Sequence, residues 1–252
     1  KGLAVAIIGI LATVTFVRSL QWSEIVSHAA IEVRNHPDSL RANYQMGRLY
    51  FKLFANEPRA NFYSESERHF RHAMTLSKIS VFSHIGLIQL AYKARVAPDP
   101  QWTADLIARL RAVDWEPNMV AVNGLVICQV QHYCRLSDAD IVSILEAALK
   151  NPNGRPKTLG SANSMLGNYY ALKMADLQKA QEYMRAAIEI EPLRHEYRMD
   201  FVGMLMAANK LDDAERQLAE ARKIDRYGIH RKQIESEAER IAFIRKQLEA
   251  PK

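Results

Sequence analysis

The side chains that could carry chemistry in this 252-residue chain are few and scattered. His69 and His72 lie three residues apart, so they would share one face of a helix, and His84 follows the next turn of the chain. A metal site needs three or four convergent ligands, so this group is interpreted as part of a solvated helix face. His195-Glu196 lacks the second histidine that a zinc-protease motif requires.

Two other features of the sequence also do not indicate a catalytic site. The run Ser64–Glu67 is more typical of a helix N-terminus than of a pair of acid–base groups. The sequence contains no Gly-rich loop that would cradle a phosphate. We therefore predict no catalytic residue, no metal ligand and no cofactor site in this chain.

The two cysteines are Cys128 and Cys134. On one predicted helix they would lie roughly 9 Å apart along its axis, because each residue rises about 1.5 Å. That separation is too long for a disulfide. Their spacing fits no metal site, and the pair is expected to say little about the redox compartment.

The clearest element pattern lies between Leu159 and Pro192. One helix is expected over about 161–173 and a second from Leu177, with a tight polar turn between them. Small residues alternate with large ones along both helices, which favours close packing of one hairpin against the next. These residues are Leu166, Gly167, Tyr170, Ala180, Met184 and Ala187.

This hairpin resembles a tetratricopeptide repeat, or TPR, a two-helix unit with Leu-Gly and Tyr on its first helix and Ala, Phe and Ala on its second. The matching residues are Leu166-Gly167, Tyr170, Ala180, Met184 in the Phe position, Ala187 and the closing Pro192. Asn163 stands where Trp is usual, and the turn is one residue longer. The resemblance implies an all-α, TPR-like superhelix, that is, a solenoid of helical hairpins.

Weaker copies of the pattern occur on both sides. An alanine lies five residues before a proline at Ala112–Pro117, at Ala147–Pro152 and again at Ala187–Pro192. These copies are 35 and 40 residues apart, and Ala187 to Ala221 is 34, the TPR period. Such periods favour a solenoid over a closed bundle.

Other helices are expected at Trp22–Arg34, Leu40–Phe54, Val81–Tyr92, Trp102–Val113, Met119–Tyr133, Asp138–Leu149, Glu196–Asn209, Leu211–Ile224 and Arg231–Leu248. An irregular insertion is expected at 55–64, and a loop that could act as a hinge at 151–157. The last helix is polar with one apolar stripe, as a cap on the terminal repeat should be.

Leu3–Val17 is an uncharged apolar run between Lys1 and Arg18. It is shorter than the ~20 residues that span a bilayer. Because the chain begins with Lys rather than Met, we favour the end of a transmembrane helix, with Arg18 and Trp22 as interface anchors. A signal-peptide core and a buried helix of a soluble domain are the alternatives. The expected domains are therefore 1–20 as membrane anchor, 21–229 as repeat domain and 230–252 as cap.

The formal charge is +6 and the basic residues are scattered along the chain without interleaved aromatic residues. This distribution argues against nucleic acid as a partner. It favours a weak preference for anionic partners or anionic lipid headgroups.

In the TPR class the first helices of the hairpins line a concave groove, and counting from the matched glycine positions predicts its residues. They are Arg41, Tyr44, Arg48 and Phe51 in the first full hairpin, Ser164, Asn168 and Ala171 in the central one, and Met199, Gly203 and Met206 in the next. Arg48 and Asn168 occupy positions that contact peptide carboxylates in some family members, although the full clamp of two Lys and two Asn is absent. The alternative is that these are ordinary exposed residues.

The segment Thr13–Tyr50 passes from the apolar run through a short helix and His36-Pro37-Asp38-Ser39 into the first repeat. It resembles the junction in multi-spanning bacterial membrane proteins of the glycosyltransferase and O-antigen polymerase or ligase type. In these proteins a last helix of the inner membrane passes into a periplasmic repeat domain. The resemblance implies that any active site lies upstream of this chain.

The leading hypothesis is a non-catalytic, membrane-tethered interaction domain. It would bind a protein or peptide partner, including a glycan-bearing one, and position it for an upstream membrane part. The alternative is an accessory part of a membrane glycosyltransferase or O-antigen polymerase or ligase, which contributes to acceptor recognition or to the active site. A soluble scaffold is the third hypothesis.

Overall fold

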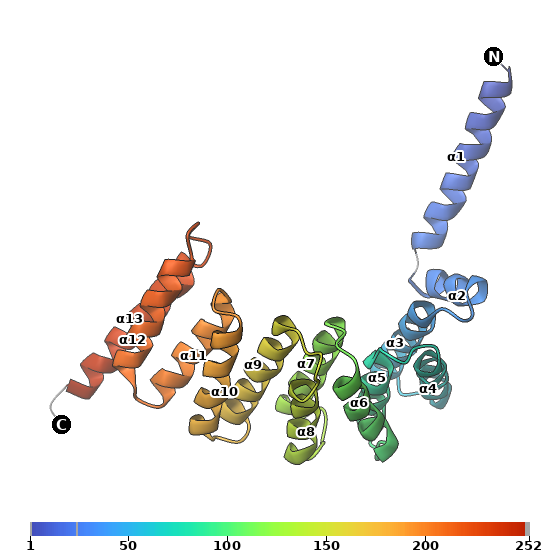
Figure 1. Ribbon diagram of the computed structural model, residues 1–252. Helices are drawn as coiled ribbons and strands as arrows, with labels where there is room; N and C mark the ends of the chain where they lie inside the picture. Colours follow the sequence, from blue (N-terminus) through green and yellow to red (C-terminus); the bar gives the residue numbers. More distant parts are fainter. Residues whose placement is uncertain (1, 24, 250–252) are drawn as a thin grey trace. The chain divides into compact units, whose positions relative to one another are not determined.

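The computed structural model describes residues 2–23 and 25–249, except for the side chains at 3–5 and 17–23. The predicted anchor side chains of Arg18 and Trp22 therefore lie outside the described residues, as do Lys1 and Glu24. Within the described ranges every regular element is an α-helix, so the predicted all-α fold is confirmed (Figure 1).

The helices are α1 (Gly2–Ser23), α2 (Ile25–Asn35), α3 (Leu40–Asn56), α4 (Ala60–Thr75), α5 (Phe82–Lys93), α6 (Pro100–Ala112), α7 (Pro117–Val130), α8 (Asp138–Leu149), α9 (Pro156–Leu172), α10 (Leu177–Ile190), α11 (His195–Ala207), α12 (Leu211–Ile224) and α13 (Arg231–Glu249).

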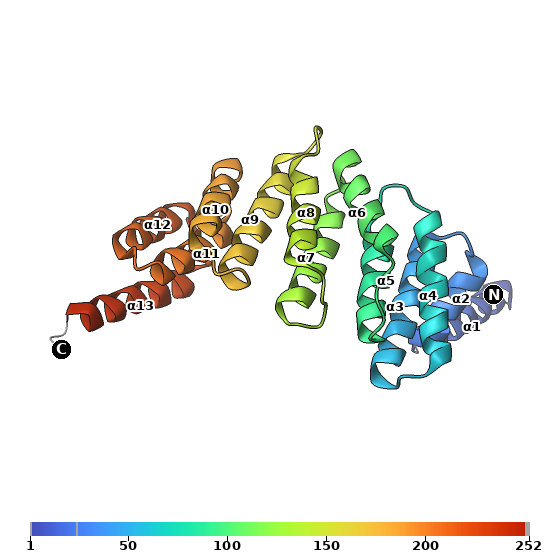
Figure 2. The same cartoon turned by 90° about the horizontal axis from the view of Figure 1, so that it is seen from below.

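The chain divides into two compact units, Lys1–Trp102 and Thr103–Lys252. In the first unit α3 and α4 form a hairpin, and α5 packs against both helices. In the second unit α9 packs on α10 and α11 on α12, and the two hairpins meet through α10 and α11, as Figure 2 shows. Helix α13 covers the last hairpin by packing on α12 and α11, with Ile234 and Ile241 as its buried residues.

The alternation of small and large residues places the hairpin interiors as predicted. On the second helices of three hairpins, every residue in the small–large–small positions is at most 1% exposed. These residues are Ser66, Phe70 and Ala73; Ala180, Met184 and Ala187; and Ala214, Leu218 and Ala221. A Cβ atom on Gly167 would lie only 3.1 Å from the carbonyl oxygen of Ala180, so the glycine permits the close helix approach.

The extra residue in the central turn has a specific backbone conformation. Ala175 has a φ of 53°, which lies in the left-handed region that L-residues seldom adopt. The next residue, Asp176, caps α10 by accepting a hydrogen bond from the Lys179 amide at 3.0 Å. Such a cap satisfies one of the amides that a helix start leaves without an intrahelical partner.

The predicted long insertion at 55–64 is wrong. Helix α3 continues to Asn56 and α4 begins at Ala60, so only three residues separate them. Pro58 stops one helix because it has no amide hydrogen and its ring blocks the preceding turn. Nothing between Ala60 and Ser64 interrupts the next helix, which therefore gains an additional turn.

The predicted hinge at 151–157 is held from both sides. The Asn151 side chain donates a hydrogen bond to the Leu110 carbonyl at 2.9 Å. The Asp114 carboxylate accepts hydrogen bonds from the Arg155 amide, the Arg155 guanidinium and the Thr158 hydroxyl. Burial alone would raise the pKa of Asp114, but these hydrogen bonds outweigh it and lower that pKa. The loop is thus fixed to the end of α6 and to the segment between α6 and α7.

The cysteine prediction is also wrong. Cys128 and Cys134 form a disulfide, with their Cα atoms 5.2 Å apart. The predicted helix to Tyr133 ends instead at Val130, and the chain folds back at His132, which has a φ of 62°. The Gln129 side chain fixes the segment after this reversal through two hydrogen bonds to Leu136. It accepts one from the Leu136 amide at 3.0 Å and donates one to the Leu136 carbonyl at 2.7 Å.

Helix α1 exposes most of the apolar side chains that are described on it, among them Ile8, Ile10, Leu11 and Phe16. In the part of the chain that the structure describes, no helix combines the length and the apolar character needed to cross a membrane. The predicted transmembrane end is therefore not confirmed, and a membrane role for this segment stays a prediction.

Candidate functional site

Helix α3 presents an outer face that is basic and carries no acidic residue. Ser39 caps the helix start, since its hydroxyl accepts a hydrogen bond from the Ala42 amide at 3.2 Å. Arg41, Arg48 and Lys52 are exposed along this face at helical spacings of seven and four. The first unit contains twelve Lys and Arg but only seven Asp and Glu, so it holds +5 of the formal charge of +6.

A pocket of about 320 Å³ opens beside this basic face. Its lining residues are Tyr44, Arg48, Phe51, Lys52, Ala55, Phe70, Gly86 and Gln89, which come from α3, α4 and α5. We call it the α3 pocket.

Phe70 and Gly86 form the apolar base of the α3 pocket. The Phe70 ring is fully buried between Gly47 of α3 and Gly86 of α5. A Cβ atom would come within 2.7 Å of this ring at Gly47 and within 2.8 Å at Gly86, closer than van der Waals contact allows. Both glycines are therefore needed for three helices to meet around one aromatic ring.

Tyr44 forms one wall of the α3 pocket. Its ring packs on Phe70 and on Phe82, with centroids 5.8 and 5.4 Å apart, and the Arg48 guanidinium carbon lies 5.9 Å from its centroid. Burial raises the pKa of Tyr44, although Arg48 opposes the shift. The phenol therefore stays neutral and serves as an amphipathic wall with a cation at its edge.

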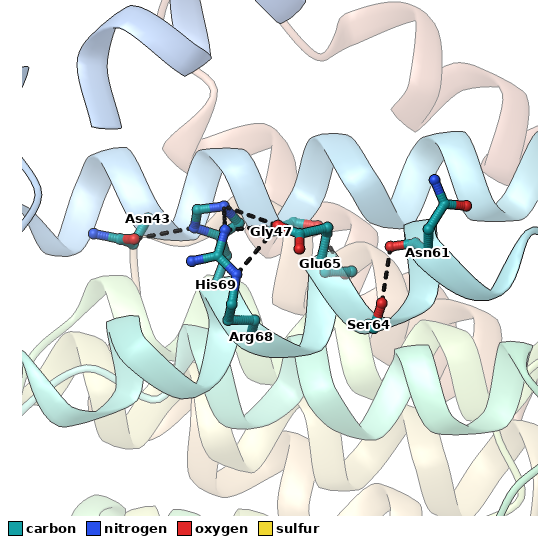
Figure 3. A network of polar contacts seen from close by, with 8 residues as sticks. Asn43, Gly47, Asn61, Ser64, Glu65, Arg68 and His69 are labelled. Carbon is teal, nitrogen blue, oxygen red and sulfur yellow. Dashed lines mark hydrogen bonds and ion pairs between the residues drawn. The ribbon is translucent and has the colours of Figure 1, made fainter. Parts of the chain in front are cut away.

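A polar network fixes α3 to α4 (Figure 3). The Arg68 guanidinium can only donate, so His69 Nε2 accepts from it at 2.9 Å and Nδ1–H donates to the Asn43 carbonyl oxygen at 3.1 Å. The Asn43 amide nitrogen in turn donates to the carbonyls of Pro37 and Ser39. Every polar atom of the Asn43 and His69 side chains therefore has a partner.

The predicted solvated helix face around His69 is wrong. His69 is buried, and so is His84, whereas His72 is half-buried and contacts the Pro37 carbonyl. Desolvation lowers the pKa of His69 to about 4, with Arg68 and His72 acting in the same direction and Glu65 against it. His69 is thus a neutral structural residue at physiological pH.

The chemistry that the arrangement offers is that of a binding pocket. Among the described residues, no group of three or more His, Cys, Asp or Glu side chains is placed to hold a metal ion. The α3 pocket combines aromatic walls with cationic edges, a combination that suits an apolar group next to a negative charge.

Three of the four residues predicted for the first hairpin line the α3 pocket, namely Tyr44, Arg48 and Phe51. Arg41 lies on the same face, one turn before Tyr44, and is exposed. Lys52 and Gln89 also line the α3 pocket and were not predicted. Lys52 lies four residues after Arg48, so helical spacing could have found it, whereas Gln89 comes from a separate helix and carried no local signal.

The second unit uses its first helices differently. The Asn168 side chain of α9 donates a hydrogen bond to the Asp200 carboxylate of α11 at 2.8 Å. Desolvation raises the pKa of Asp200 even though the residue as a whole is exposed, while the bond from Asn168 opposes this shift and Glu196 adds to it. Asn168 therefore joins two neighbouring hairpins.

The other residues predicted for this face are mostly inside the repeat. Ser164, Met199 and Met206 are each 7% exposed, while Ala171 is half-buried and Gly203 is exposed. On α11 the exposed residues are Glu196, Asp200, Gly203 and Ala207. Of the residues predicted for this face on α11 only Gly203 is exposed, and the exposed residues next to Met199 and Met206 are Asp200 and Ala207.

Of the comparisons with known proteins, the one with solved structures supports the fold. No family model matches the chain, and no curated protein matches it. The structure is similar to the crystal structure of yeast Tom70, with a TM-score of 0.52 and 14% identity over 88% of this chain and 43% of that one. It is also similar to pilF of Pseudomonas aeruginosa, with a TM-score of 0.42 and 12% identity over 82% of this chain and 93% of that one.

This chain spans less than half of the yeast protein, and at such low identity the likeness concerns the fold alone. Together with the hairpin packing described above, it confirms the predicted TPR-like repeat fold.

Proposed function

We propose that this chain is a protein-interaction scaffold whose first unit binds a partner through the basic face of α3. The observation that carries the proposal is the α3 pocket, because Arg48 and Lys52 at its edge form no ion pair among the described residues. TPR-like hairpins stabilise one another through their interiors and leave such faces free for ligands.

We further propose that the scaffold is tethered to a membrane through its N-terminal segment. The exposed apolar side chains of α1 support this, since a large exposed apolar surface commonly marks a membrane or protein contact. The scaffold would then hold a partner or a glycan-bearing acceptor close to an upstream membrane part.

The Cys128–Cys134 disulfide supports a compartment outside the reducing cytosol. For a bacterial protein at the inner membrane that compartment is the periplasm. Trapping free thiols with an alkylating reagent in intact cells tests this placement: we expect both cysteines to be protected until a reductant is added. Free thiols in untreated cells would contradict it.

Photo-crosslinking in the full-length protein tests the binding face. A photoreactive residue at Gln45, exposed on α3 next to Tyr44, should yield a defined partner adduct. The matched position is Asn61, exposed on α4 of the same unit, which should yield none. Identical adduct patterns at the two positions, or no adduct at either, would remove the support for a binding face on α3.

The junction sequence Thr13–Tyr50 favours a second candidate, an accessory part of a membrane glycosyltransferase or O-antigen polymerase or ligase. Deleting Ser39–Lys252 from the full-length protein separates the two candidates. If the chain only positions a partner, transfer to a small acceptor persists. If it completes an active site, that transfer is lost while the membrane part remains folded.

A further inference from the structure

We propose that the α3 pocket takes an internal segment of an acidic protein partner, in which one large apolar side chain enters the pocket and flanking Asp or Glu side chains meet Arg41, Arg48 and Lys52. This inference rests on the proposed function and names the chemistry of its partner.

The size of the α3 pocket selects a single side chain. Pockets for small ligands range from about 300 to 1,000 Å³, so 320 Å³ lies at the lower limit. Its base is the buried Phe70 ring and the bare backbone of Gly86, while Tyr44 and Phe51 supply aromatic walls. A bulky apolar or aromatic side chain finds apolar contact on each of these sides.

The cations of α3 are available because the acids of the neighbouring helix are engaged elsewhere. Glu65 and Glu67 of α4 form ion pairs with Arg68 and Arg71 of the same helix. Glu57 in the connecting turn pairs with Arg59.

Among the described residues no ion pair is formed by Arg41, Arg48 or Lys52. These three side chains therefore form an excess of positive charge on the face where the pocket opens. That excess is the complement of an acidic partner.

The spacing of these cations suits an extended chain. At 1.5 Å per residue, Arg48 and Lys52 lie about 6 Å apart along α3, and Arg41 lies roughly 10 Å from Arg48. An extended segment advances about 3.3 Å per residue, so acidic side chains within about five residues of one another reach all three cations. A protein segment fits this pattern better than a lipid surface, because a flat layer of headgroups does not place an apolar group inside a concave pocket.

The probe is an acetylated and amidated peptide with a central Trp flanked on each side by Asp and Glu, labelled for fluorescence anisotropy and titrated with the full chain. Blocked ends exclude recognition of a free terminal carboxylate. We expect saturable binding that weakens at least tenfold when the Trp is replaced by Ala, and that weakens further with added salt.

The double variant Arg48→Gln, Lys52→Gln should weaken binding at least tenfold. Its matched control is Arg34→Gln, Lys78→Gln, which removes the same charge from exposed positions of the same unit away from the pocket and should leave the affinity unchanged. Ala55→Leu fills the pocket without changing the charge and should also weaken binding.

Equal losses in the two double variants would overturn the proposal in favour of net charge alone. Equal binding of the Trp and Ala peptides would show that the pocket is not used. Binding only to a peptide with a free C-terminus would overturn the internal segment, and binding only to phosphatidylglycerol vesicles would replace the peptide with a membrane surface. A Gln45 crosslink without peptide binding would reject this partner chemistry and leave the proposed function intact.

Discussion

The residue that follows the central glycine differs between the first helices of the two units. In the first unit Arg48 follows Gly47, extends over Tyr44 and borders the α3 pocket. In the second unit Asn168 follows Gly167 and is already bonded to Asp200 on the next hairpin. The same position of the repeat therefore faces a ligand-sized pocket in one unit and holds two hairpins together in the other.

This difference shows that the repeat sets the backbone and the interior but not the use of the outer face. Both glycines lie at tight helix contacts, against Phe70 in the first unit and against Ala180 in the second. What distinguishes the outer faces is local charge, with three cations on α3 and two acids, Glu196 and Asp200, exposed on α11. Four experiments can break or sharpen this contrast.

The largest effect is expected from Phe70→Ala. Removing this fully buried ring leaves a cavity between three helices and should lower the free energy of unfolding of the first unit by about 3–5 kcal/mol. Hydrogen exchange followed by mass spectrometry resolves the loss of protection in each unit. The matched variant Met184→Ala removes the residue in the same repeat position of α10 and should affect only the second unit. Equal losses in both units for either variant would show that the two are one cooperative body.

The second effect is a pH dependence of the first unit that arises from His69. The pKa of His69 is about 4 in the folded chain and about 6.5 when unfolded. As the pH falls from 6.5 to 4 the unfolded chain binds a proton that the folded chain does not, so stability falls across this window by on the order of 3 kcal/mol. Hydrogen exchange of α3 and α4 at several pH values measures this loss.

His69→Gln should flatten that pH profile. In the second unit burial and the stacked ring of His230 lower the pKa of His195, while Asp225, Glu196 and Gln233 oppose the shift. His195→Gln should therefore leave the α3 and α4 profile unchanged. A profile that persists in His69→Gln would assign the pH dependence to another group, such as Glu65.

The third effect is a loss of stability in the second unit. Replacing both Cys128 and Cys134 by Ser opens a short closed loop and should destabilise the second unit by about 2 kcal/mol. Protection of α3–α5 and binding of the acidic peptide should stay the same. A loss of peptide binding in this variant would contradict the assignment of the binding face to the first unit alone.

The smallest effects concern glycines on the outer surfaces of the second unit. A Cβ atom at Gly124 of α7 or at Gly203 of α11 meets no atom within 4 Å. Each Gly→Ala change there should stabilise the second unit by about 0.5–1 kcal/mol, because it restricts the unfolded chain and favours helix. Gly47→Ala should do the opposite and cost about 1–3 kcal/mol through its contact with Phe70. Thermal unfolding of the three single variants checks these signs.

Several features could be predicted because they depend on residues near one another in the chain. Helices α8 and α12 have the predicted bounds, since their apolar periods and flanking turns are local signals. Counting from Gly47 selected Tyr44, Arg48 and Phe51, which the structure places around the α3 pocket. The residues predicted on α11, Met199, Gly203 and Met206, lie 35 residues after Ser164, Asn168 and Ala171, and of the three only Gly203 is exposed.

The order of helices and the buried small–large–small positions of the hairpins were thus determined by the sequence alone, because periodicity and packing volume are written in consecutive turns. Only the tertiary structure decided that Cys128 meets Cys134, because pairing depends on where α7 ends and how the backbone reverses at His132. It also decided that His69 is buried and that Gln89 joins Arg48 around one pocket. These outcomes require separate helices to converge in space, and no local pattern encodes that convergence.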